Sequence, residues 1–160
     1  MNILESYRKI RDLPYHISTK GEPGFDCVDK AKMLIDEARK MGLGARLRIG
    51  LFDWSAVKLP DKVIKTKHDQ RCSHAFCEIK NEQGEWIVVD PTWNKELKQA
   101  GFPISAWDGK HSTKLAIECD KVLSPEESIK YIDDFDCIDD ILKNGNFYEA
   151  INRYCDSFLK

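Results

Sequence analysis

Two stretches near the start of the chain carry apolar residues at helical spacing. The first, Met1 to Lys9, mixes apolar and charged residues and predicts an amphipathic helix. The second begins at Cys27, with Asp26 as a suitable N-cap and Asp29 in the first turn, where negative charge is favoured. Its apolar positions are Val28, Ala31, Leu34, Ile35, Ala38 and Met41. We expect it to end at Gly42 or Gly44, because glycine readily takes the left-handed conformation that follows many helices.

After these glycines the pattern changes to partial alternation, which predicts a strand over residues 45–52. Two more strands are predicted over 74–79 and 86–90, joined as a hairpin by a short glycine-containing loop. If the hairpin is centred on Glu82, His74 lies opposite Asp90. Such partners have Cβ atoms about 4.5–5.5 Å apart, within reach of an imidazole–carboxylate hydrogen bond. A slip of one residue would place the two side chains on opposite faces of the sheet.

The C-terminal part is predicted to be largely helical. A weak alternation over 113–119 indicates one further strand. Ser124, Pro125 and Glu127 supply an N-cap, a first-turn proline and a capping-box glutamate, which predict the start of a helix. The dipeptide Asn144-Gly145 is expected to separate a short acidic segment from a final amphipathic helix near 147–158.

Two long irregular connections cover residues 53–71 and 95–112. The first is mostly polar and is equally consistent with a wall of a functional site and with a solvated surface insertion. The second carries Phe102 and Trp107, for which packing into the core is favoured over a substrate groove.

Cys27, His74 and Asp90 together suggest a nucleophile, a base and an orienting group. A thiol attacks carbonyl carbon usefully as a thiolate, so it needs positive potential from helix N-terminal amides or from an imidazolium. Each of the three residues alone has an ordinary structural explanation, and their joint order and context favour a catalytic triad. His68 and His111 are reserve candidates for the imidazole, but neither has an aspartate on a predicted paired strand.

This pattern resembles the transglutaminase-like core. The resemblance rests on the triad order, the step from Gly42 to Arg46, and the motif His-Ala-Phe-Cys-Glu before Trp-Ile-Val-Val-Asp-Pro-Thr-Trp, and it covers about residues 24–94. It implies an α+β, papain-like fold in which the nucleophile begins a helix packed on an antiparallel sheet, with extra C-terminal helices. The implied chemistry is acyl transfer from a peptide or protein amide, through a thioester on Cys27, to water or to an amine, without a cofactor. His74 would act as general base and acid, and Asp90 would hold its tautomer.

Two departures from the family bear on activity. Phe76 stands where the family often has tryptophan, which keeps an aromatic ring. No glutamine precedes Cys27, so the second oxyanion donor beside the Cys27 amide would be Tyr15 or His16. The alternative is a catalytically inactive module of the same fold that binds a peptide or protein.

Composition limits the other possibilities. A chain of 160 residues, 42% of them hydrophobic, suits one domain over residues 1–160, with a helical extension over about 124–160. A net charge of −2 and the lack of a basic stripe disfavour nucleic acid and anionic membranes as partners. The N-terminus does not read as a secretion signal, and no apolar run reaches membrane-spanning length, so we expect a cytoplasmic protein.

The six cysteines lack Cys-x-x-Cys pairs, and reduced thiols are expected. The one metal-like cluster contains Cys72, His74 and Cys77. Strand alternation places Cys77 on the face opposite to the other two, so a shared tetrahedral ion is not expected.

Overall fold

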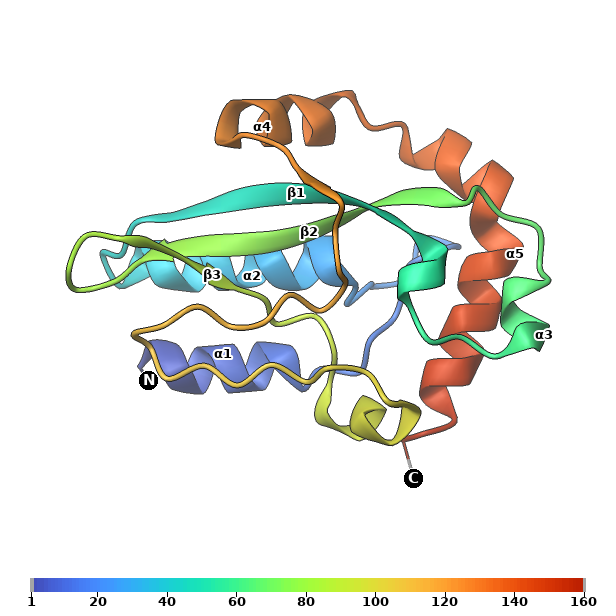
Figure 1. Ribbon diagram of the computed structural model, residues 1–160, viewed down its shortest axis with the longest axis horizontal. Helices are drawn as coiled ribbons and strands as arrows, with labels where there is room; N and C mark the ends of the chain where they lie inside the picture. Colours follow the sequence, from blue (N-terminus) through green and yellow to red (C-terminus); the bar gives the residue numbers. More distant parts are fainter. Residues whose placement is uncertain (1, 160) are drawn as a thin grey trace.

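The computed structural model describes residues 2–159. Its main helices are α1 (Ile3–Arg11), α2 (Cys27–Lys40), α3 (Asp61–Ile64), α4 (Pro125–Asp134) and α5 (Cys137–Asp156). The short 3-10 helices are η1 (Trp54–Ala56) and η2 (Lys95–Ala100). The strands β1 (Ala45–Asp53), β2 (Arg71–Lys80), β3 (Trp86–Val89) and β4 (Lys121–Val122) form one antiparallel sheet in the order β3-β2-β1-β4. The α+β prediction is therefore confirmed (Figure 1).

Helix α2 begins where the sequence predicts. Asp26 and Asp29 form a reciprocal capping box, in which each carboxylate accepts the backbone N–H of the other residue at 3.1 Å. Gly42 follows the helix with a φ of 78°, and Gly44 does not share this conformation. Of the two expected ends, Gly42 is the one that the chain uses.

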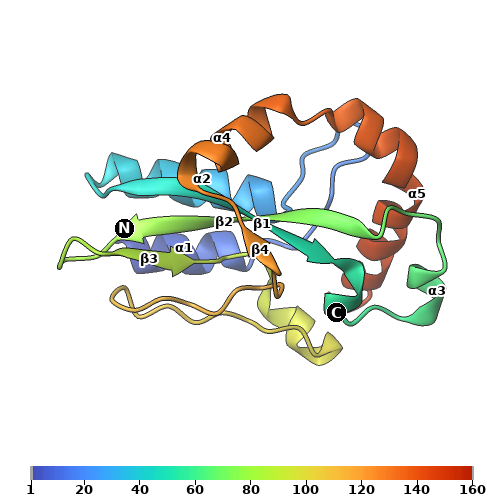
Figure 2. The same ribbon diagram turned by 45° about the horizontal axis from the view of Figure 1, so that its top comes forward.

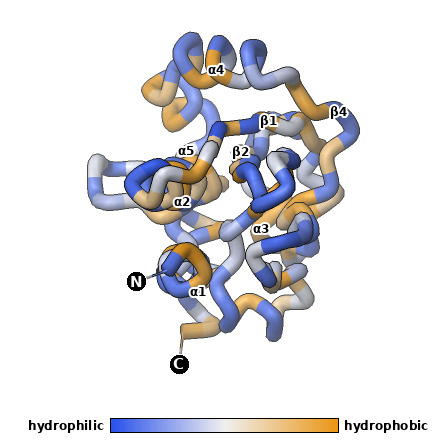
Figure 3. The backbone as a smooth tube through the Cα atoms, turned by 90° about the vertical axis from the view of Figure 1, so that its left-hand side faces the viewer, coloured by the Kyte–Doolittle hydropathy of each residue, from blue (hydrophilic) through white to orange (hydrophobic). Residues whose placement is uncertain are grey.

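Helix α2 packs against β2 and β1, and α1 lies alongside α2 (Figure 1). The interface buries Leu34 and Ala38 of α2 with Ile79 of β2 and Tyr7 of α1. Polar and apolar residues alternate along α1 and α4, as expected of helices that lie on the surface (Figure 3). No helix within residues 2–159 combines the length and the apolar character needed to cross a bilayer.

The register of the β2–β3 hairpin corrects the predicted one by two residues. Cys77 pairs with Val89 and Lys80 with Trp86, so the hairpin is centred on residue 83 and Asp90 lies beyond the ladder. The Asn81 side chain accepts the backbone N–H groups of residues 83 and 85, at 3.0 and 2.9 Å, which draws Glu85 into the loop. A shift of two preserves the facing of every side chain.

The strand predicted over 113–119 is wrong. This segment crosses the sheet from the β3 edge to the β1 edge, as Figure 2 shows. Thr113 N–H donates to Val88 of β3 at 2.8 Å, whereas Asp120 N–H donates to Leu51 of β1 at 3.0 Å. Because it passes across the sheet, it cannot join the hydrogen-bonded ladder, and only residues 121–122 form β4.

The predicted break at Asn144-Gly145 is also wrong, because α5 continues through both residues. The Asn144 side chain accepts the Asp69 backbone N–H at 2.8 Å and donates to Asp140 one turn earlier at 3.0 Å. Tertiary contacts therefore hold the residue in the helix against its turn propensity. The predicted helix start at Ser124 is confirmed, with Ser124 and Glu127 forming a capping box.

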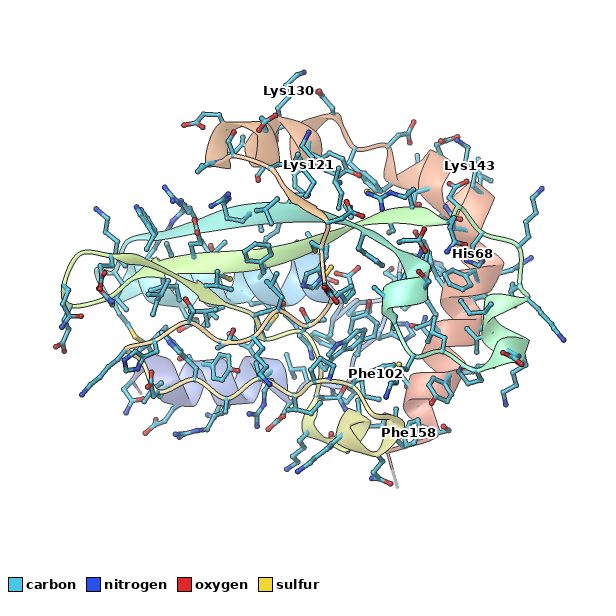
Figure 4. All side chains as sticks on the ribbon, viewed as in Figure 1. His68, Phe102, Lys121, Lys130, Lys143 and Phe158 are labelled. Carbon is cyan, nitrogen blue, oxygen red and sulfur yellow. The ribbon has the colours of Figure 1, made fainter. Side chains whose placement is uncertain are left out.

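A second core lies between α5 and the end of the sheet. It is rich in aromatic rings, and Trp54, Trp93, Phe102 and Phe147 are buried in it. Phe102 lies toward the C-terminal end of α5 (Figure 4), and Trp107 is buried in the core between α1 and α2. The expectation that both aromatics serve the core is confirmed.

Candidate active site

Cys27 is the first residue of α2 and points its sulfur at β2. Its Sγ atom accepts the backbone N–H of Ala75 at 3.5 Å, so the thiol lies beside the residue that follows His74. The capping box fixes the helix start, and β2 presents His74 to it. Local capping and sheet packing thus bring a thiol and an imidazole together from positions far apart in the sequence.

His74 and Asp90 form a buried pair. Both are at most 1% exposed, and His74 Nε2 lies 2.7 Å from Asp90 Oδ2. Although Asp90 is not directly opposite His74 in the ladder, the chain leaving β3 carries its carboxylate to the ring. The backbone N–H of Ala116 donates to the same Oδ2 at 2.7 Å, and both the N–H and the hydroxyl of Thr92 donate to Oδ1. Asp90 is therefore held by donors on both oxygens.

The other ring nitrogen of His74, Nδ1, is buried and has no hydrogen-bond partner within the described chain. The Cys27 thiol lies close enough to the His74 side chain to act on the pKa of the ring. Burial opposes protonation of His74, but Asp90 and then Cys27 outweigh it and raise the pKa of His74 to about 10. Burial favours the neutral form of Asp90 and so tends to raise its pKa. The positive charge of His74 has the larger effect, and the pKa of Asp90 is lowered.

The pKa of Cys27 is raised above its ordinary value. Burial is the main cause, and Asp26 adds to it, while the hydrogen bond and charge of His74 oppose it. Burial therefore opposes formation of the Cys27 thiolate, and His74 is the neighbouring group that favours it.

A small cavity of about 110 Å³ opens beside the thiol. Its wall contains residues from several separate parts of the chain, including Tyr15, Asp26, Trp54, Ser73 and Phe135. A neighbouring cavity of about 230 Å³ shares several of these walls and is also lined by Asp69 and Arg71. The connection 53–71 therefore contributes a wall beside Cys27, which was one of the two alternatives open from the sequence.

The structure separates the two oxyanion candidates. Tyr15 is 6% exposed and lines the cavity that contains Cys27. Burial raises its pKa, with Cys27 and Asp26 adding to the effect. His16 instead pairs its backbone with Phe25 and directs Nε2 toward Glu22 at 3.6 Å, and it does not line this cavity.

The reserve histidines lie elsewhere. His68 stacks on Phe147 of α5 with ring centroids 3.8 Å apart (Figure 4), and His111 pairs with Asp108 on the surface. Within residues 2–159, no three His, Cys, Asp or Glu side chains gather as metal ligands. Cys77 donates its thiol to the Ala31 carbonyl at 3.2 Å, away from His74.

Sequence reasoning missed Lys30, which lies one turn after Cys27. The side chain is 0% exposed, and its Nζ donates to three backbone carbonyls near the site. The sequence does contain a sign of this burial. Residue 30 lies on the same face of the helix as Ala31 and Leu34, so a lysine there interrupts the apolar face.

Comparison with protein families identifies a match. A family model of the transglutaminase-like superfamily covers residues 5–91, more than half of the chain and the part that contains Cys27, His74 and Asp90. The chain belongs to the transglutaminase-like superfamily. Searches of curated proteins and of solved structures find no match.

Proposed function

We propose that this protein is a cysteine enzyme that transfers the acyl group of a peptide or protein amide through a thioester on Cys27. The observation that carries the proposal is the buried relay, in which Asp90 occupies one nitrogen of His74 and leaves Nδ1 for the thiol. An imidazole oriented in this way can take the thiol proton and return it to a leaving amine. On this proposal the fold is of the papain-like type and residues 1–160 form one cytoplasmic domain, with neither nucleic acid nor membrane as a partner.

The proposed reaction begins from the neutral form of His74, whose Nδ1 takes the proton of Cys27, and the thiolate then attacks the amide carbon. The backbone N–H of Cys27 and the hydroxyl of Tyr15 would hold the oxygen that becomes negative. His74 then protonates the amine, the carbon–nitrogen bond breaks and a thioester remains. Water or a second amine, deprotonated by His74, attacks the thioester and releases Cys27. We propose water as the acceptor, since hydrolysis does not need a channel that excludes solvent.

The alternative is a binding module that recognises a peptide in the same cavity without turnover. The observation that favours it is the burial of Cys27, which raises the pKa of the thiol. In that case Cys27 and His74 would be packing partners.

Alkylation of the full chain with iodoacetamide, followed by peptide mapping, separates the two functions. Cys137 is exposed and provides an internal reference. If His74 activates Cys27, the alkylation rate of Cys27 depends on the imidazole, because His74 opposes the burial that raises the pKa of the thiol. The variant His74→Gln should then slow the alkylation of Cys27 by about tenfold or more, while the alkylation rate of Cys137 stays unchanged. An unchanged Cys27 rate in His74→Gln would contradict the enzyme proposal and favour the binding module.

A further inference from the structure

Lys30 is a buried cation with an unusual set of partners. Lysine is almost never fully buried unless it is paired, and the ion pairs found among residues 2–159 do not include Lys30. Its Nζ donates to the carbonyls of Arg11 at 2.8 Å, Leu13 at 2.6 Å and Thr92 at 2.9 Å. These three bonds use every donor that an ammonium group has.

The three carbonyls belong to the two segments that flank the proposed active site. Arg11 is the last residue of α1, Leu13 lies just beyond the helix, and the chain reaches Tyr15 two residues after Leu13. Thr92 lies two residues after Asp90, and its N–H and hydroxyl bind the Asp90 carboxylate. Lys30 therefore connects the helix that begins at Cys27 to both segments through one nitrogen atom.

The charges around Lys30 are mixed. Burial lowers its pKa to about 7; Asp12, Asp90 and Glu96 oppose this change, whereas Arg11 adds to it. On α5, Cys155 also lies within the influence of the lysine charge. The three carbonyl dipoles favour the charged form as well. An apolar side chain of the same length would avoid the cost of burying a charge, but it could not hold three carbonyls in place.

We infer that Lys30 is a positioning residue, whose ammonium holds the segments of Asp90 and Tyr15 at a fixed place relative to Cys27. It does not touch the reacting atoms. This inference rests on the proposed function for its catalytic consequence, but its structural part can be tested separately. Without Lys30, the Thr92 carbonyl is free to move, and Asp90 moves with it, away from His74.

The test replaces Lys30 with methionine in the full chain, with Lys32→Met as the matched control, because Lys32 is exposed on the same helix. The main readout is the pKa of the His74 ring, measured by NMR. Displacement of Asp90 removes its raising effect, so the pKa should fall by about 1–3 in Lys30→Met. Loss of the nearby positive charge alone would instead raise this pKa or leave it unchanged. A merely structural lysine would lower the melting temperature without lowering the pKa of His74.

The second readout is alkylation of Cys27 by iodoacetamide below the melting temperature of each variant. We expect the alkylation rate of Cys27 to fall by about ten- to a hundredfold in Lys30→Met, as for other small misplacements at active sites. In Lys32→Met the rate should not change. If Lys30→Met does not fold, Lys30→Arg carries the test, because it keeps the charge and the donors with a different geometry and should lower both readouts partially. A His74 pKa equal to or above that of the Lys32→Met control overturns the inference. If the pKa falls in Lys30→Met while His74→Gln leaves the alkylation rate of Cys27 unchanged, the positioning role stands and the enzyme proposal fails.

Discussion

Replacing Asp90 with asparagine tests the buried relay directly. Both carboxylate oxygens accept hydrogen bonds from a backbone N–H, Oδ1 from Thr92 at 3.2 Å and Oδ2 from Ala116 at 2.7 Å. The amide nitrogen of asparagine is a donor and must replace one of the two oxygens. In either orientation it faces a backbone N–H that cannot reverse its role, so one buried donor loses its acceptor.

The magnitude follows from burial. A buried donor without a partner costs about 1–3 kcal/mol, and removing one charge of a buried pair costs about 3–5 kcal/mol in total. A chain of this size loses about 2–4 °C in melting temperature for each kcal/mol. We therefore expect Asp90→Asn to lower the melting temperature by roughly 10 °C near pH 6, where both partners of the pair are charged.

The matched control is Asp108→Asn. Asp108 Oδ2 lies 2.7 Å from His111 Nδ1, the same separation as in the buried pair, but the two side chains are 55% and 81% exposed. Solvent screens this pair, so its loss should not change the melting temperature measurably. Asp108 also accepts two backbone N–H groups, from Lys110 and His111, so the two sites differ mainly in burial. Equal shifts in the two variants, measured by calorimetry at one pH, would refute the argument that burial makes Asp90 critical.

Two further predictions concern stability. The pKa of His74 is raised to about 10. The contribution of the charged ring to the free energy of unfolding is therefore complete below the ordinary histidine pKa near 6.5 and is lost as the pH rises through 10. The contribution of Asp90, whose pKa is lowered, is lost as the pH falls below its ordinary value of 3.8. The difference in melting temperature between the unmodified chain and His74→Gln should therefore be largest near pH 5–6 and shrink toward pH 10; a constant difference would show that the pair is not ionised. A pair of glycine variants tests the fold: a Cβ at Gly50 would lie 2.9 Å from Cys119 Cβ, whereas at Gly145 its nearest neighbour, in Ile141, is 3.4 Å away. Denaturant titration should show Gly50→Ala losing about 1–3 kcal/mol and Gly145→Ala gaining about 0.5–1 kcal/mol, and a loss at Gly145 would argue against a continuous α5.

Local interactions explain what the sequence alone made predictable. The start of α2 depends on Asp26 and Asp29, which contact each other within one turn, and the start of α4 depends on Ser124 and Glu127 in the same way. These motifs act over three residues and need no partner from elsewhere in the chain. The order Cys27, His74 and Asp90 also indicated the family, which the comparison of residues 5–91 confirmed.

Contacts between distant segments decided the rest. The hairpin register depended on the Asn81 side chain in the loop, and Asp90 reaches His74 from beyond the ladder with help from Ala116. Helix α5 continues through Asn144 because Asp69 satisfies its side chain.

The arrangement around Cys27 was likewise a tertiary outcome. Tyr15 rather than His16 lines the cavity, and the carbonyls that Lys30 binds come from α1 and from the loop after β3. Capping motifs and hydrophobic periodicity depend on residues that are near one another in the sequence. The hydrogen-bond partner of a buried polar group often comes from a distant segment, so it depends on the tertiary structure. The sequence therefore determined where the elements begin and which residues could react, and only the tertiary structure determined which buried polar groups meet.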